Sequence, residues 1–135
     1  MFRVYKGMYS LKPIKEIDPF LLGLKALHRF AYVSTETVLV QKGIILQNIA
    51  VVTLISDVSR SFSIASHKYR CRKLKDKYLY NPAGIITQGD IKIATVERAV
   101  ADMLYFNPRA HFDGAGMINW SKVRDIQKEI GYPLT

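Results

Sequence analysis

This 135-residue chain has a single cysteine, no long apolar run and no familiar catalytic motif. One thiol, Cys71, cannot form an internal disulfide, which excludes a disulfide-built secreted domain and fits a reducing cytoplasm. The longest apolar runs, Ile49–Ile55 and Phe20–Leu22, are too short to span a bilayer. Residues Met1–Lys12 lack the apolar stretch of a secretory signal. We therefore expect a soluble cytoplasmic protein with no membrane partner.

Residues that usually carry enzyme or metal chemistry are sparse as well. There is no Gly-rich phosphate loop ending in Lys-Ser/Thr and no Gly-x-Ser-x-Gly. The three histidines are His28, His67 and His111, and none has metal-ligand spacing to another His or Cys. Cys71 is expected to face inward, which favours a buried thiol over a reactive one. The sequence therefore predicts no enzyme, no metal and no cofactor.

The composition indicates one domain with a cationic surface. Apolar residues make up 49% of the chain and charged residues 23%, which allows a real hydrophobic core. The net charge is +9. A small cationic domain favours anionic partners such as nucleic acid or an acidic protein surface.

The N-terminal part combines turn signals with short apolar runs. Met1–Leu11 predicts a short strand or hairpin arm that turns at Gly7. Asp18-Pro19 predicts a helix start, because an Asx cap precedes proline at the first helical position. This helix is expected to continue to Phe30, and Gly23 would allow another backbone to pack closely on it. Its inward face is expected to hold Phe20, Leu24, Leu27 and His28.

Strand signals dominate the middle of the chain. Ser34 opens a second, shorter helix that Gly43 ends. The expected strands that follow are Ala50–Ile55, Ser61–Ala65, His67–Leu74 and Asp90–Ala94. Because these strands cluster rather than alternate with helices, we expect an α+β fold. It would have a small mixed or antiparallel central sheet flanked by about four helices.

The clearest helix of the chain follows Thr95, its expected cap. Apolar side chains recur at helical spacing on one side, at Val96, Ala99, Val100, Met103 and Leu104. Arg98 and Asp102 would then form an ion pair on the opposite, outer side. A last helix is expected to be capped by Ser121 and to stop at Gly131.

The expected strand His67–Leu74 carries the most suggestive local pattern. It places three basic side chains on one face at steps of about 6.6 Å, namely Lys68, Arg70 and Arg72. Lys73 and Lys75 continue the charge beyond it. Such a row suits a phosphate backbone or an acidic protein surface. The alternative is the solvated outer face of an edge strand, whose charges discourage aggregation.

Scattered acids leave a second hypothesis open, a divergent nuclease-like or nucleotide-processing enzyme. A nuclease would need two or three carboxylates converging on a divalent metal, here Asp90, Glu97 and another acid. Glu97 is better explained by its place in the first turn of a helix, where the dipole favours an acid. A third hypothesis is an interaction module whose basic strand docks an acidic partner by strand addition.

Several segments together point to a known family. Tyr32-Val33-Ser34 enters a helix that ends at Gly43-Ile44, and Val51-Val52-Thr53 and Tyr69-Arg70 belong to the strands that follow. The longest segment is Ile93-Ala94-Thr95-Val96-Glu97-Arg98-Ala99-Val100-Ala101-Asp102-Met103-Leu104-Tyr105. Over roughly residues 1–106 the sequence resembles the AbiEi family, the antitoxins of type IV abortive-infection toxin–antitoxin pairs. Val96 stands where that family usually has proline.

The N-terminus resembles another part of the same family. Arg3-Val4-Tyr5-Lys6-Gly7-Met8-Tyr9 is similar to the closing β-wing of the winged helix-turn-helix that precedes this domain. The resemblance implies a wing remnant at residues 1–12 and an antitoxin body domain at residues 13–135. In that family the helices that read DNA come before this wing, so the resemblance leads us to expect a chain without most of the winged helix-turn-helix.

The resemblance implies an antitoxin and transcriptional autoregulator in phage defence. Its implied partners are operator DNA and a cognate nucleotidyltransferase-like toxin, which the antitoxin need not bind stably. The residues assigned to binding have electrostatic roles and none is catalytic. They are Lys68, Arg70, Arg72, Lys73 and Lys75, with Arg3 and Lys6 on the wing remnant.

Overall fold

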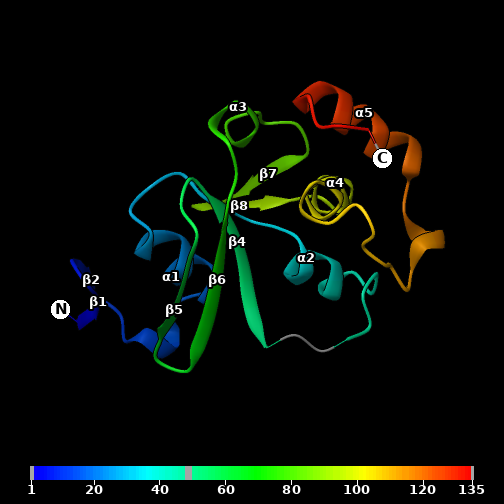
Figure 1. The fold of residues 1–135 in the computed structure, drawn as a ribbon. Coiled ribbons are helices and arrows are strands. Elements are labelled where there is room, and N and C mark those ends of the chain that lie inside the picture. The colour runs from blue at the N-terminus through cyan, green and yellow to red at the C-terminus, as the bar shows by residue number, and fades with distance from the viewer. Residues whose placement is uncertain (1, 48–49, 135) are drawn as a thin grey trace.

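The structure is a computed structural model that describes residues 2–47 and 50–134. It is an α+β fold, as the clustering of strands predicts (Figure 1). A hairpin of β1 (Phe2–Tyr5) and β2 (Met8–Ser10) forms a small sheet of its own. The other strands are β3 (Tyr32–Val33), β4 (Val51–Ser56), β5 (Arg60–Ile64), β6 (His67–Lys73), β7 (Ile85–Gln88) and β8 (Ile91–Ala94). The helices are α1 (Pro19–Ala26), α2 (Glu36–Gln41), α3 (Asp76–Leu79), α4 (Val96–Phe106) and α5 (Trp120–Ile130), with 3-10 turns at Ile14–Glu16 and Ala115–Met117.

The central sheet is mixed, with the strand order β5-β6-β4-β3-β8-β7. β4 runs parallel to β6 and β3 runs parallel to β8, whereas the other neighbours are antiparallel. Two elements, α3 and β7, lie where the sequence signals predict no helix or strand. Each has four residues, which is too short for a periodic pattern to emerge.

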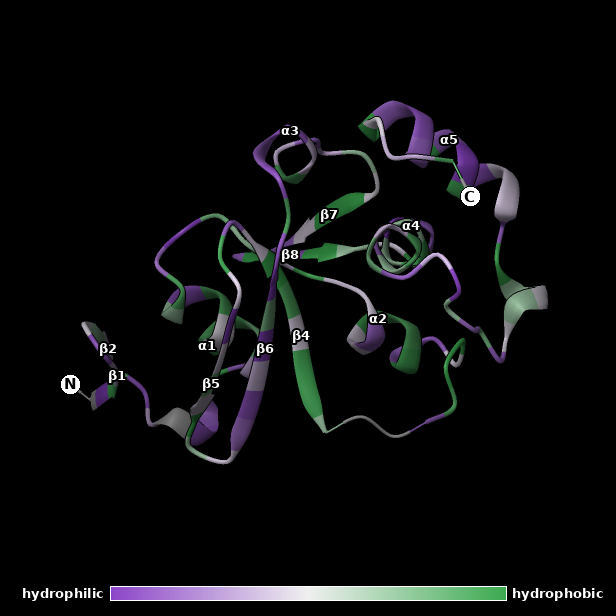
Figure 2. Cartoon of the chain, viewed as in Figure 1, coloured by the Kyte–Doolittle hydropathy of each residue, from purple (hydrophilic) through white to green (hydrophobic). Residues whose placement is uncertain are grey.

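Helices cover both faces of this sheet. Strand register places Leu54 and Cys71 on one face and Ile55 and Arg72 on the other. α1 packs on the first face, while α2 and α4 cover the second and α5 lies outside α4 (Figure 1). Figure 2 shows the resulting contrast: β4, between the helical layers, is mostly hydrophobic, whereas β6 is largely hydrophilic. The core therefore lies around β4 and β3 rather than at the ends of the sheet.

The N-terminal hairpin turns at Gly7, as predicted, with a φ of +67° that glycine adopts readily. It is held by two contacts to the main body. The Tyr5 ring lies 5.8 Å from the ring of Phe62 on β5, and His28 Nε2 lies 3.2 Å from the carbonyl oxygen of Lys6. The hairpin therefore sits beside β5, on the α1 side of the sheet.

The start of α1 is confirmed, but its end is not. The Asp18 carboxylate accepts a hydrogen bond of 2.8 Å from the N–H of Phe20, and Pro19 is the first helical residue. The helix ends at Ala26 rather than Phe30, and His28 is exposed with a φ of +54°. His28 therefore does not belong to the inward face, whereas Leu24 and Leu27 are buried as predicted. The helix also buries Leu22, Gly23 and Ala26.

Gly23 lets the Tyr69 ring of β6 lie directly against α1. A methyl group at position 23 would lie 2.5 Å from Tyr69 Cδ1 and still closer to Cε1, well inside van der Waals contact. The ring cannot easily withdraw, because its hydroxyl donates to the carbonyl oxygen of Pro19 at 2.6 Å and its face stacks on Phe62 at 4.9 Å. The predicted close approach at Gly23 is thus made by a side chain rather than by a backbone.

The ends of α4, α5 and α2 lie close to the positions that the sequence predicts. The capping residue differs from the prediction in α5 and in α2. Thr95 caps α4 by accepting from the N–H of Arg98 at 3.3 Å, as predicted. α5 is capped by Asn119, two residues before the predicted Ser121, and it stops at Gly131 as expected, where φ is +95°. α2 begins one residue beyond the N-cap position Thr35 rather than directly after Ser34.

The prediction for the outer side of α4 is wrong. Arg98 and Asp102 do form the i,i+4 ion pair, with 3.1 Å between Arg98 Nε and Asp102 Oδ1. Both side chains, however, are completely buried. The reason is that α5 and the C-terminal segment cover the side of α4 that the amphipathic pattern assigns to solvent.

The Asp102 carboxylate accepts four hydrogen bonds in this buried site. Oδ1 accepts from Arg98 Nε and, at 2.6 Å, from the Tyr132 hydroxyl. Oδ2 accepts from the Tyr32 hydroxyl at 2.9 Å and from the Ser34 hydroxyl at 2.8 Å. A buried charge is tolerated only when it is paired and hydrogen-bonded, and this carboxylate is fully satisfied.

Arg98 extends the same buried network toward the loop before β7. Its Nη1 donates to the carbonyl oxygens of Asn81 and Ala83 at 2.9 and 2.8 Å. Its Nη2 donates to the Tyr32 hydroxyl at 3.0 Å. The pair therefore ties together α4, β3, the loop after α3 and the chain beyond α5.

The hydroxyl of Tyr132 provides a direct test of this network. Burial first, and then the nearby Asp102 carboxylate, raises the pKa of Tyr132 far above its ordinary value. We expect Tyr132→Phe to lower the free energy of unfolding at neutral pH by about 1.5–3 kcal/mol, the range for hydrogen bonds to charged groups. Urea unfolding followed by circular dichroism measures this change.

The same residue predicts a pH dependence. Above about pH 10 the unfolded chain releases the phenol proton whereas the folded chain keeps it, so stability falls as the pH rises. Tyr132→Phe should make that alkaline fall shallower and leave the stability difference constant at lower pH. Tyr9→Phe is the matched control, because Tyr9 is 60% exposed. Identical alkaline profiles for the wild type and Tyr132→Phe would contradict the network.

The Gly23–Tyr69 contact predicts an unusual sign for a glycine substitution. Alanine at an exposed helix position stabilises by about 1 kcal/mol relative to glycine. Because the ring is held, Gly23→Ala should instead destabilise by roughly 1–3 kcal/mol, as overpacking does. Gly116→Ala is the control, since a methyl group there meets nothing within 4 Å. A rise in the urea midpoint of Gly23→Ala would disprove the close contact.

Candidate nucleic-acid interface

The basic strand β6 lies inside the sheet, between β5 and β4. It is therefore not an edge strand, which removes the explanation that its charges protect an edge. Its side chains alternate as predicted: Tyr69 and Cys71 are buried, while Lys68 and Arg70 are exposed on the opposite face. β5 forms the edge of the sheet beside it.

An uncovered part of the sheet surface surrounds Lys68 and Arg70. The register places Ser63 opposite Lys68 and Ser61 opposite Arg70, and both serines are exposed. An open hollow of about 310 Å³ lies here, lined by Val51, Ser61, Phe62, Ser63, Lys68, Tyr69 and Arg70. We call the exposed residues Ser61, Ser63, Lys68 and Arg70 the β5–β6 strip. It contains two cations and two hydroxyls, and no acid lines the hollow.

Arg72 points to the same face but is engaged by the fold. Its two terminal nitrogens donate to the two carboxylate oxygens of Glu36 at 2.8 and 2.7 Å, and its guanidinium lies 5.5 Å from the Phe106 ring centre. Burial by itself would raise the pKa of Glu36, but the hydrogen bonds from Arg72 help to lower it below the ordinary value. The expected row of three free cations is therefore a row of two.

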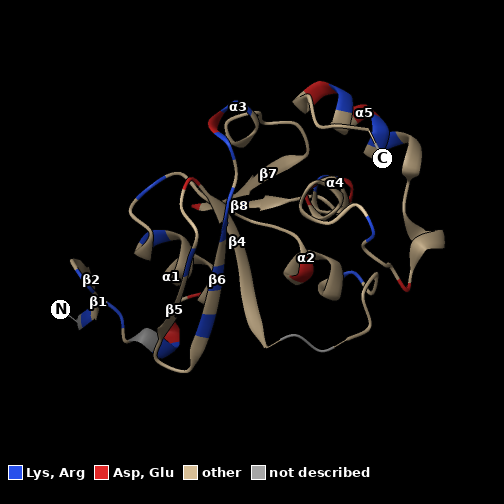
Figure 3. Cartoon of the chain, in the orientation of Figure 1, with Lys and Arg blue, Asp and Glu red and all other residues tan. Residues whose placement is uncertain are grey.

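The other predicted residues lie on separate surfaces. Lys73 is exposed, but by strand alternation it faces the α1 side of the sheet. Lys75 is exposed immediately before α3. Arg3 and Lys6 are exposed on the hairpin, which packs beside β5 on the α1 side. In Figure 3 the Lys and Arg positions, in blue, are spread over several elements, including β6, α3 and α5.

The two serines of the strip were not predicted as site residues. The alternation of Ser61–Ala65 does place them on a solvent face in the sequence. Nothing local, however, indicates that β5 pairs with β6 in the register that sets Ser61 beside Arg70. This register depends on the tight turn at Ala65 and Ser66, where Ala65 has a φ of +53°.

The acids of the enzyme hypothesis do not converge. Glu97 lies in the first turn of α4, with Oε1 3.6 Å from Lys122 Nζ, and Asp90 is exposed in the turn between β7 and β8. Across the part of the chain that the structure describes, no three His, Cys, Asp or Glu side chains gather closely enough to hold a metal ion. The specific site that this hypothesis requires is therefore not formed among these residues.

The thiol of Cys71 is buried, as predicted. Burial raises its pKa to about 11, which disfavours the reactive thiolate. The thiol donates to the carbonyl oxygen of Val58 at 3.3 Å. Cys71 is therefore a buried, hydrogen-bonded thiol on β6.

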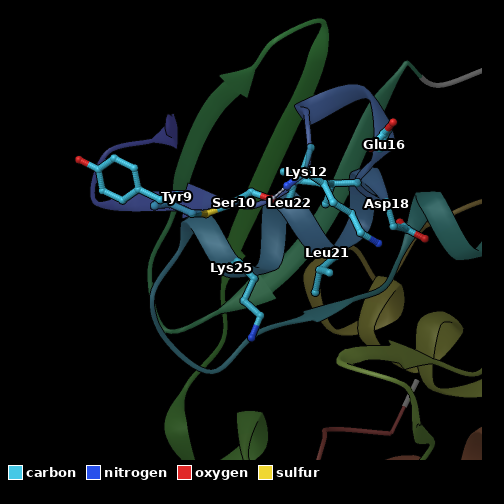
Figure 4. A pocket seen from close by; sticks show the side chains of 10 residues that line it. Tyr9, Ser10, Lys12, Glu16, Asp18, Leu21, Leu22 and Lys25 are labelled. Atoms are coloured by element: carbon cyan, nitrogen blue, oxygen red, sulfur yellow. Dashed lines mark hydrogen bonds between the residues drawn. The ribbon is translucent and has the colours of Figure 1, made fainter. Parts of the chain in front are cut away.

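A second groove, of about 380 Å³, lies between the hairpin and α1 (Figure 4). Its rim carries charges of both signs, from Lys12 and Lys25 and from Glu16 and Asp18. Asp18 is already used as the helix cap, and Figure 4 shows the Tyr9 ring pointing away from the groove. This mixed rim is less suited to a polyanion than the β5–β6 strip.

Comparison with known proteins found no matching family model, no matching curated protein and no matching solved structure. Within residues 2–47 and 50–134, none of the helices combines the length and the apolar character needed to cross a bilayer.

Proposed function

We propose that this chain is the body of a type IV antitoxin and autoregulator, acting through a basic surface without catalysis. The observation that carries the nucleic-acid part of this proposal is the β5–β6 strip, where Lys68 and Arg70 are exposed with no acid lining the hollow. The resemblance to the AbiEi family supports the antitoxin part. The cytoplasm, where operator DNA and a nucleotidyltransferase-like toxin would be met, is the compartment that this role requires.

The chemistry of the strip favours the phosphate backbone over the bases. Lys68 and Arg70 are two residues apart, a step of about 6.6 Å along an extended strand. Serine hydroxyls at Ser61 and Ser63 add neutral donors of the kind that position phosphate oxygens. The aromatic rings of Phe62 and Tyr69 belong to the α1 face, so the strip offers no exposed ring on which a base could stack. Binding through this strip should therefore depend little on sequence.

The nucleic-acid proposal is tested by a salt series. Duplex DNA is titrated with the wild type, with Lys68→Ala/Arg70→Ala, and with Arg124→Ala/Lys128→Ala, whose exposed residues lie on α5. Each double variant removes two positive charges. Because each phosphate contact contributes about 0.9 to the slope of log affinity against log salt, the strip variant should lose about two units of slope. The α5 control should keep the wild-type slope.

Other outcomes of this titration contradict the proposal. Equal losses in both double variants would mean that net charge, not the strip, governs binding. Absence of binding by the wild type would exclude the strip as a nucleic-acid surface. Arg72→Ala serves as a further control, since it should lower stability by breaking the Glu36 pair while leaving the salt slope almost unchanged.

The antitoxin proposal is tested by growth. Cells that express the nucleotidyltransferase-like toxin of the same operon should form colonies when this chain is co-expressed. The α5 control variant should protect them equally, and the strip variant should not, because the proposed action requires the basic surface. Immunoblotting checks that the variants accumulate equally. Failure of the wild-type chain to protect would overturn the antitoxin assignment, and full protection by the strip variant would show that this surface is not needed.

A further inference from the structure

The six-stranded sheet has two edges, and they differ in chemistry. Within the described residues β5 pairs only with β6, and β7 pairs only with β8. An edge strand presents unpaired N–H and C=O groups, which can pair with another chain unless charge, proline, a bulge or a covering segment prevents it. The two edges therefore differ in their capacity to bind a further strand.

The β5 edge is protected. Arg60, at the start of this edge strand, is exposed and charged. The hairpin packs against this edge through the Tyr5–Phe62 contact. A second copy of this +9 chain would meet like charges there.

Among the residues that the structure describes, the β7 edge has none of these protections. Its sequence, Ile85–Gln88, contains no charged residue and no proline, and its pairing with β8 has no bulge. Ile86, Thr87 and Gln88 are exposed, with 45% of Ile86 accessible to solvent. This is a regular, β-branched and uncharged edge on a strongly cationic chain.

The backbone of β7 shows which groups are available. Thr95 N–H donates to the carbonyl oxygen of Gly84 at 2.8 Å, so Gly84 faces the β8 side. Because antiparallel hydrogen bonds alternate along a strand, Ile86 and Gln88 also face β8. The N–H and C=O of Thr87 therefore point away from the sheet and are placed to pair with another strand.

A hollow of about 400 Å³ lies beside this edge, between β7–β8, α2 and the start of α4. Its apolar lining includes Val38, Ile86, Ile93 and Val96. Its walls carry one cation, Lys42, and one anion, Glu97. A surface that binds a copy of itself avoids repulsion when it carries charges of both signs or no charge. The hollow carries one charge of each sign, and β7 carries no charge.

We propose that two copies of this chain associate through β7, pairing antiparallel about a two-fold axis to join their six-stranded sheets. A two-fold interface uses the same patch on both subunits, and an uncharged strand meets its copy without repulsion. A four-residue strand and its neighbouring hollow bury an area at the low end for specific complexes, under about 1,200 Å². The dimer is therefore weak and forms with rising concentration. It does not depend on the proposed binding of nucleic acid.

Sedimentation velocity over a range from micromolar to near-millimolar concentration tests this dimer. The wild type should shift from monomer to dimer, and Thr87→Pro should raise the dissociation constant at least tenfold. Proline removes only the outward N–H of Thr87, so the pairing of β7 with β8 is kept. Ile86→Lys should also raise the dissociation constant, because it places one positive charge from each copy near the two-fold axis. Leu11→Lys is its matched control, because Leu11, just after the hairpin, is 82% exposed.

Engineered cysteines locate the contact independently. Ile86→Cys, Thr87→Cys and Gln88→Cys are each oxidised mildly, and at least one should form a covalent dimer, because a two-fold axis brings one position of the strand against its own copy. Leu11→Cys should not, and the buried Cys71 gives little background. A wild type that stays monomeric throughout, with no cross-linking above the Leu11→Cys level, overturns the proposal. So does a dimer that Thr87→Pro leaves intact.

Discussion

The architecture depends on one buried charge, the carboxylate of Asp102. Because an unpaired carboxylate cannot be kept ionised in the core, each of its four hydrogen-bond donors must come to it. Those donors come from β3 and the residue after it, from α4 and from the chain beyond α5. Arg98, its partner, then satisfies its remaining donors on the loop before β7. Removing one member of such a pair typically costs about 3–5 kcal/mol, a large fraction of the stability of a small domain.

This buried pair also explains why the β5–β6 strip is uncovered. It holds α4 against β3, so that α2 and α4 cover the middle of the sheet, and Arg72 is the β6 cation that reaches their rim at Glu36 and Phe106. Lys68 and Arg70 lie farther along the same strand, beyond that cover. The surface available to a polyanion is thus set by where the helices stop, not by the number of basic residues in the sequence.

Local signals predict most elements of this fold but few of its contacts. Caps, prolines and apolar spacing identify α1, α4, β4, β5 and β6, because each signal acts within a few residues. The same spacing assigns Arg98 and Asp102 to the outer side of α4. The sequence pattern of an i,i+4 ion pair is identical whether the pair lies on a surface or in a core. Its burial depends on Tyr32 and Tyr132, which are 70 and 30 residues from Asp102. The ion pair between Arg72 and Glu36 joins residues 36 positions apart, so local sequence patterns do not predict it either.

The two sheet edges set what a dimer of this chain can do. In a pair joined through β7, the strand order separates the two β6 strands by nine inter-strand spacings, or on the order of 40 Å along the sheet at about 4.8 Å each. That span resembles the roughly 35 Å helical turn of DNA. Adjacent strands twist by about 20–25°, however, so nine steps rotate one strip by roughly half a turn relative to the other. The two strips would then face opposite directions, a geometry that bridges two duplexes rather than clamping one.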